Sequence, residues 1–98
     1  NVPFATAHEF KSFLLRGSAS TGSLIDTALQ AREPGAGVHL LVQLNAGVIG
    51  LYHGAHPARI VATVLAEPEF APLRVDLRRE LTHLTRALVG AIPCKDQP

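Results

Sequence analysis

Three histidines are the residues whose type and spacing could support chemistry together. His39 and His53 lie on two segments that the sequence predicts to pair as neighbouring strands, and His56 follows three residues later. Three neutral imidazoles can bind Zn²⁺ and leave its fourth position for water or another ligand. No Asp or Glu stands beside them to accept the proton of the other ring nitrogen, a role that a backbone carbonyl can also fill. A His-rich metal site is therefore one hypothesis. A solvated or pH-sensitive pair of imidazoles is the other.

No residue pattern typical of an enzyme is visible. The sequence shows no nucleophile beside a base, no paired carboxylates and no glycine loop of the kind that holds phosphate. The single cysteine, Cys94, lies in a tail beside Pro93 and Lys95 and has no visible partner base. We therefore expect a protein that is not an enzyme and that needs no cofactor.

Composition limits the kinds of partner. Only 17% of the residues are charged and 47% are hydrophobic, whereas about 25% charged residues are usual. Nine Lys and Arg against eight Asp and Glu give a net charge of +1, which supplies little attraction for nucleic acid. No apolar run approaches the roughly 18 residues that cross a bilayer. We expect a soluble protein whose partner is another protein or a second copy of itself, with no membrane partner, while the charge does not favour nucleic acid and does not exclude it.

The length of the chain predicts one domain. With 98 residues it falls within the single-domain range, so residues 1–98 are expected to share one core. The chain begins at Asn1, contains no methionine and closes with a polar tail, which suggests a fragment or module of a larger protein or assembly. One cysteine cannot form an intramolecular disulfide, which favours an intracellular origin.

Two short helices are predicted near the N-terminus. Thr6 and Glu9 match a capping box, and apolar residues at helical spacing follow, so the first helix is expected over residues 7–16. The small residues of 17–22 are interpreted as a linker. A second helix is expected from about residue 24 to Arg32.

A β-hairpin is predicted in the middle of the chain. Residues 38–44 and 48–53 are rich in β-branched and aliphatic side chains, and Asn45-Ala46-Gly47 between them suits a three-residue turn. Strand alternation makes both faces of this hairpin apolar, so it requires cover on both sides, from the rest of the chain or from a partner.

The last part of the chain is predicted to be mainly helical. Residues 57–67 fit a helix better than a third strand, and leucines at spacings of three and four predict a long helix over 73–91. The resulting expectation is an α+β fold. Its small antiparallel sheet has two or three strands and packs with two short N-terminal helices and a long C-terminal helix.

Two sets of apolar residues are candidates for contact with a partner. One set is a face of the predicted hairpin, and the other is the leucine stripe of the last helix. Apolar surface with few charges favours a protein-interaction or dimerisation module, although the same residues could form the core instead. The candidate interface residues are Leu41, Ile49, Leu51, Leu77, Leu81, Leu84 and Leu88.

Two helices followed by a hairpin also match part of a winged-helix nucleic-acid-binding domain. That alternative would need a third helix before the wing and basic residues at its tip, whereas the predicted tip is Asn45-Ala46-Gly47. The basic residues of the last helix are interrupted by Asp76 and Glu80, which is typical of a solvated helix face. The interaction module is therefore preferred over the nucleic-acid and metal alternatives.

Overall fold

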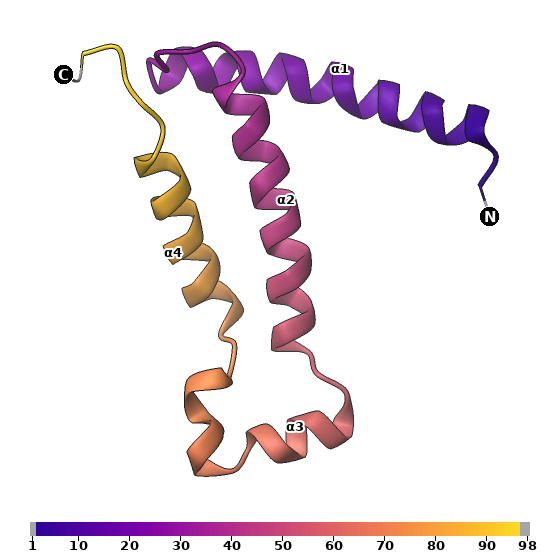
Figure 1. Ribbon diagram of the computed structural model, residues 1–98, viewed down its shortest axis with the longest axis vertical. Coiled ribbons are helices and arrows are strands. Elements are labelled where there is room, and N and C mark those ends of the chain that lie inside the picture. The colour runs from indigo at the N-terminus through magenta and orange to yellow at the C-terminus, as the bar shows by residue number, and fades with distance from the viewer. Residues whose placement is uncertain (1, 97–98) are drawn as a thin grey trace. The chain divides into compact units, whose positions relative to one another are not determined.

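The computed structural model describes residues 2–96, and the regular structure of this part of the chain is helical (Figure 1). No strand occurs within these residues, and the β-type pairing found there is an isolated antiparallel bridge between Ala31 and Cys94. The elements are α1 (Phe4–Ala28), α2 (Ala36–Ala55), α3 (Arg59–Leu65), the 3₁₀ helix η1 (Pro68–Leu73) and α4 (Leu77–Gly90).

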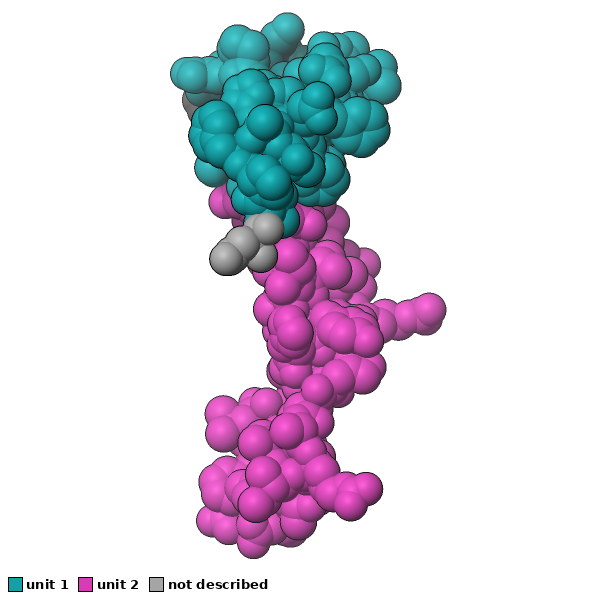
Figure 2. All heavy atoms as spheres, turned by 90° about the vertical axis from the view of Figure 1, so that its right-hand side faces the viewer, with its two compact units in different colours: residues 1–42, 90–98 teal, residues 43–89 magenta. Residues whose placement is uncertain are grey.

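The chain divides into two compact units, which Figure 2 shows in different colours. Unit 1 comprises residues 1–42 and 90–98, and unit 2 comprises residues 43–89. The helix α2 contributes its first turns to unit 1 and the remainder to unit 2.

The predicted α+β fold is wrong, because residues 38–53 belong to a helix and form no hairpin. The predicted turn residues Asn45 and Gly47 lie in the middle of α2. Gly47 has a packing role instead, since a Cβ atom there would overlap the Leu84 side chain of α4. The β-branched residues of this segment were a poor guide, because tertiary contacts routinely override their preference for strands. Without a hairpin there is also no wing, so the winged-helix alternative has lost its basis.

The two predicted N-terminal helices are one helix, α1, and the predicted linker at 17–22 lies inside it. Gly22 is buried, and a Cβ atom on it would lie 2.6 Å from Val38 Cγ2. A Cβ atom on Gly37 would overlap the carbonyl oxygen of Gly22. These two glycines therefore let α1 and the first turn of α2 approach backbone to backbone. Composition alone does not distinguish this packing role from that of a linker.

Both ends of α1 differ from the prediction. The helix begins at Phe4 after Pro3, with no side-chain hydrogen bond at the cap, so the predicted capping box lies inside the helix. It ends at Ala28, before the predicted end at Arg32. The chain then turns at Gln30, whose φ of 51° lies in the left-handed region.

Asp26 connects the end of α1 to the start of α2 within unit 1. The backbone N–H of Gly37 donates to Oδ1 of Asp26 at 2.6 Å, and the N–H of Gly35 donates to Oδ2 at 3.0 Å. A carboxylate that accepts free amides at a helix N-terminus satisfies their hydrogen bonds and interacts favourably with the helix dipole. Asp26 therefore fixes the point at which α2 begins.

The segment that follows α4 binds to this same turn of unit 1. The backbone N–H of Arg32 donates to the carbonyl of Pro93 at 2.8 Å, and that of Lys95 donates to the carbonyl of Gln30 at 2.9 Å. The Arg32 guanidinium also donates to the carbonyl of Cys94 at 3.1 Å. These hydrogen bonds enclose Ala31, which is 7% exposed.

Residues 59–65 of unit 2 are helical, as favoured from the sequence, and Arg74 caps the end of this helix. Its Nε atom donates to the carbonyl of Leu65 at 2.5 Å, and Nη2 donates to Ala66 at 3.0 Å and to Glu67 at 3.2 Å. The last carbonyls of a helix have no partner within it, so the guanidinium satisfies groups that would otherwise require water.

The predicted helix over 73–91 is confirmed in its central part and begins later than expected. The preceding residues form η1, and α4 starts at Leu77. Asp76 caps it, because its Oδ1 accepts the backbone N–H of Arg79 at 3.1 Å and its carbonyl accepts that of Glu80 at 2.9 Å. The helix ends at Gly90, shortly before Pro93.

Few apolar side chains are buried. Among residues 2–96 the fully buried apolar side chains are those of Ala31 and Leu40, and none has less than 2% of its surface exposed. Large apolar side chains on α1 and α2 remain exposed. In the part of the chain described, no helix has both the length and the apolar character that crossing a membrane requires.

Candidate functional site

The most extensive apolar surface of α2 lies on one side of that helix. Positions three, four and seven residues apart share a helix face. Seven residues of α2 lie at these spacings from Asn45, with Asn45 itself included. Three of their apolar side chains are more than half exposed: Val42 at 59%, Ile49 at 53% and Tyr52 at 51%. The seven are Val38, Leu41, Val42, Asn45, Val48, Ile49 and Tyr52; Val38 is half-buried against Gly22 of α1, and we call the other six the outer face of α2.

The inner side of α2 contacts the rest of its own chain. Leu40 is 5% exposed in unit 1. In unit 2, Gly47 lies against Leu84, and a Cβ atom on Gly54 would lie 2.9 Å from Val75 Cγ2. Small residues on this side permit close packing, whereas Val42, Ile49 and Tyr52 on the other side stay exposed.

The hairpin residues predicted as an interface do not share one face of α2. Leu41 and Ile49 belong to the outer face, whereas Leu51 lines a hollow together with Gly47 and Leu84. A strand would have grouped these three by alternation, and the helix separates them because its period is 3.6 residues. Leu41 and Ile49 therefore remain candidates for a partner contact, and Leu51 is half-buried beside the hollow in unit 2.

The leucine stripe of α4 is half-buried in unit 2. Leu84 contacts Gly47 of α2, which places this side of α4 against its own chain. Leu77 and Leu81 line a second open hollow with polar neighbours such as Thr85. All four leucines of the stripe are half-buried: Leu77, Leu81, Leu84 and Leu88.

The three candidate metal-binding histidines are all exposed, and the structure does not assemble them into a site. His39 lies near the start of α2 and His53 near its end, so the cross-strand pairing that motivated the metal hypothesis does not exist. His56 follows α2 and stacks on Tyr52, with ring centroids 4.2 Å apart. Within residues 2–96, no group of three or more His, Cys, Asp or Glu side chains is placed to hold a metal ion.

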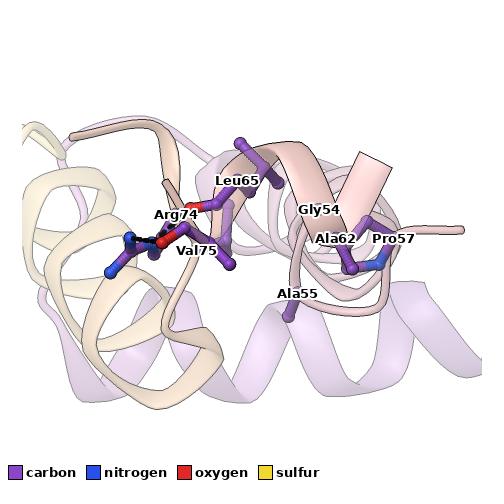
Figure 3. A pocket seen from close by; sticks show the side chains of 8 residues that line it. Gly54, Ala55, Pro57, Ala62, Leu65, Arg74 and Val75 are labelled. Atoms are coloured by element: carbon purple, nitrogen blue, oxygen red, sulfur yellow. Dashed lines mark hydrogen bonds between the residues drawn. The ribbon is translucent and has the colours of Figure 1, made fainter. Parts of the chain in front are cut away.

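An open hollow of about 450 Å³ lies in unit 2 between the end of α2, α3 and the segment before α4. Its lining is mostly apolar, and Arg74 lies at one side, where its guanidinium donates to the carbonyl of Leu65 (Figure 3). The other lining residues are Gly54, Ala55, Pro57, Ala62, Ala66 and Val75. The volume falls in the range of roughly 300–1,000 Å³ that is common for small-ligand sites.

A second exposed apolar strip runs along α1. Phe10 and Phe13 are 58% and 65% exposed, and Leu24 is 71% exposed further along the same side of the helix. Helical spacing of such residues is typical of a helix that packs on another element.

Sequence reasoning missed the residues that organise these surfaces. Asn45 was interpreted as a turn residue, and the capping roles of Asp26 and Arg74 were not anticipated. A helical count over 38–52 would have found the outer face of α2, because its apolar positions recur at intervals of three and four. The contacts of Asp26 and Arg74 depend on loop geometry, which the sequence does not specify.

The structure is that of a helical domain with exposed apolar faces. The chain belongs to the family described as "Tetracyclin repressor-like, C-terminal domain", whose model matches residues 1–91. No curated protein and no solved structure gave a match. Domains of this family typically mediate ligand binding and dimerisation in transcriptional regulators, and they belong to regulators, not to enzymes. Such regulators bind DNA, so membership leaves nucleic acid open as a partner of proteins that contain this domain.

Proposed function

We propose that this chain is a dimerisation domain of a transcriptional regulator and that the outer face of α2 forms the main contact. The observation that carries the proposal is the composition of α2: its 20 residues include no Asp, Glu, Lys or Arg. Its polar side chains are His39, Gln43, Asn45 and His53, and an apolar stripe of a helix is normally buried against another element. The inner side packs within the chain and the outer side does not, so a partner is needed to cover it.

The character of the outer face supports a protein partner. Cores of protein interfaces lack charged residues and are enriched in aromatic side chains such as Tyr52. A helix of 20 residues is about 30 Å long. This length is enough for α2 to form the centre of a protein interface of standard size, to which neighbouring elements would contribute further area.

Light scattering after size-exclusion chromatography tests this function. The expected mass is twice the 10.4 kDa of one chain across a concentration series. Ile49→Glu places a charge on the outer face and should raise the dimer dissociation constant at least tenfold, since burial of an unpaired carboxylate costs well over the ~1.4 kcal/mol that a factor of ten represents. Gln43→Glu is the matched control, because Gln43 is exposed on α2 away from the outer face. A wild-type chain that stays monomeric at every concentration would contradict the proposal.

The hollow beside α3 favours a second candidate function, the binding of a small and mainly apolar effector. Anilinonaphthalene sulfonate can serve as the probe, because its rings fit an apolar lining and its fluorescence rises when they leave water. Ala62→Phe should fill the hollow and lower dye binding, whereas Ala87→Phe adds the same side chain to an exposed position of α4 that does not line it. Equal dye binding by the two variants would argue against a site in the hollow.

A further inference from the structure

We propose that residues 74–76 couple the hollow beside α3 to the first turn of α4. An apolar ligand in the hollow then stabilises the start of a helix that it does not touch. This inference rests on the proposed effector site and adds a structural consequence of its occupancy. All the residues that carry it belong to unit 2.

The three residues of this segment each contact a different helix. Arg74 donates three hydrogen bonds to carbonyls at the end of α3 and just beyond it. Val75 packs on Gly54 of α2, and its Cγ2 atom lies 2.9 Å from the position that a Cβ atom on the glycine would take. Asp76 caps α4, because its carboxylate and its carbonyl each accept a backbone N–H of the first turn, at 3.1 and 2.9 Å. Residues 74–76 therefore form a junction of three helices.

The hollow meets this junction on one side. Arg74 and Val75 line the hollow (Figure 3), whereas Asp76 and the residues of α4 do not. Gly54, on which Val75 packs, is also part of the lining. A ligand that fills the hollow therefore contacts Val75 directly and affects α4 through the junction.

Val75 has little room to move away from such a ligand. Because Gly54 has no side chain, Val75 already occupies the space that a Cβ atom there would need. Its own Cβ and Cγ1 atoms lie 3.6 and 3.9 Å from that position, in addition to the closer Cγ2 atom. Closely packed groups are hard to compress and transmit displacement to their neighbours. An apolar ligand in the hollow therefore holds Val75 against α2.

The two neighbours of Val75 cannot move independently of it. Consecutive Cα atoms lie about 3.8 Å apart across planar peptide groups, so few dihedral angles are free between Arg74 and Asp76. Movement of Val75 away from α2 displaces the caps on both sides, and restriction of Val75 stabilises them. The junction is thus closed with both caps formed, or open with both weakened. An element with two such states is what coupling between separate sites requires.

Coupling between two sites acts in both directions. If a ligand favours the closed junction, loss of a cap must weaken binding of the ligand by the same factor. Asp76 is the informative position, because it caps α4 and does not line the hollow. Asp76→Ala should lower the affinity of the hollow by up to about fivefold, the factor that corresponds to the ~1 kcal/mol of a lost N-cap.

Hydrogen exchange of the wild-type chain, with and without anilinonaphthalene sulfonate, tests the coupling directly. The amides of Arg79 and Glu80, which Asp76 accepts, should exchange more slowly when the dye is bound. At a dye concentration about ten times the dissociation constant the slowing should reach roughly tenfold, since the dye binds the closed junction. The amide of Gly37 is the matched control, because Asp26 accepts it in unit 1, and its exchange should not change.

Dye titrations test the reverse direction with two cap variants. Asp76→Ala should weaken dye binding, and Asp26→Ala, which removes a helix cap from unit 1, should not. Both variants lose a cap, so an effect of general destabilisation on dye binding would appear in both. Equal weakening by the two variants would overturn the inference.

Ala62→Phe separates the coupling from the effector site itself, because Ala62 lines the hollow. If this variant loses the dye, but the dye leaves the first-turn amides of α4 unchanged in the wild-type chain, the coupling is wrong and the effector site stands. If Ala62→Phe and Ala87→Phe bind the dye equally well, the effector site and the coupling are both removed.

Discussion

Replacing Gly37 with alanine should destabilise unit 1, although alanine is the better helix former. A Cβ atom at this position would overlap the carbonyl oxygen of Gly22 and would lie 2.9 Å from both its carbonyl carbon and its Cα. All three are backbone atoms of a helix, so no side-chain rotation can relieve the contact. The start of α2 must therefore move away from α1.

The magnitude follows from two opposed contributions. Alanine in place of glycine inside a helix contributes about 0.5–1 kcal/mol to stability. Overpacking usually costs about 1–3 kcal/mol, and the upper end applies because the neighbour is backbone. The net expectation for Gly37→Ala is a loss of about 2 kcal/mol in the free energy of unfolding.

Gly17→Ala is the matched control, because it lies in α1 and its Cβ atom would meet nothing within 4 Å. It should stabilise the chain by about 0.5–1 kcal/mol. Urea unfolding followed by circular dichroism, at one fixed protein concentration, measures both variants, and Gly37→Ala should lower the midpoint by about 1–2 M. Equal or greater stability of Gly37→Ala relative to Gly17→Ala would refute the close approach of α1 and α2.

Three further substitutions test single contacts by the same unfolding measurement. Asp26→Ala removes the acceptor of two amides at the start of α2 and should cost about 1–2 kcal/mol, while an unchanged midpoint would show that water replaces the carboxylate. Gln30→Gly should stabilise by up to about 1 kcal/mol, because glycine adopts a φ of 51° without a Cβ penalty; a loss of stability would contradict that backbone conformation. Arg74→Met keeps the aliphatic stem but loses three hydrogen bonds to carbonyls near the end of α3. The free energy of unfolding should fall by about 1 kcal/mol, because the group is exposed. An unchanged midpoint would show that water satisfies these carbonyls equally well.

The sequence predicted the helical parts of the fold where apolar spacing alone decides the structure. The leucines of α4 recur every three or four residues and gave the centre of that helix correctly. The ends were less predictable, because they depend on tertiary contacts such as those of Asp26 and on caps such as Asp76. Glycine was the most misleading residue, since Gly22 and Gly47 allow close packing in positions that resemble a linker and a turn.

The error over residues 38–53 and the interaction hypothesis have the same physical origin. Strand alternation made both faces of this segment apolar, and a hairpin with two apolar faces requires cover on both sides. The helix that is present also exposes apolar residues, because the absence of Asp, Glu, Lys and Arg from α2 does not depend on its secondary structure. Its own chain covers the side that bears Leu40 and Gly47, whereas Ile49 on the other side remains 53% exposed. The proposal of a protein partner therefore does not depend on the predicted hairpin, and the helical period identifies the residues that the proposal involves.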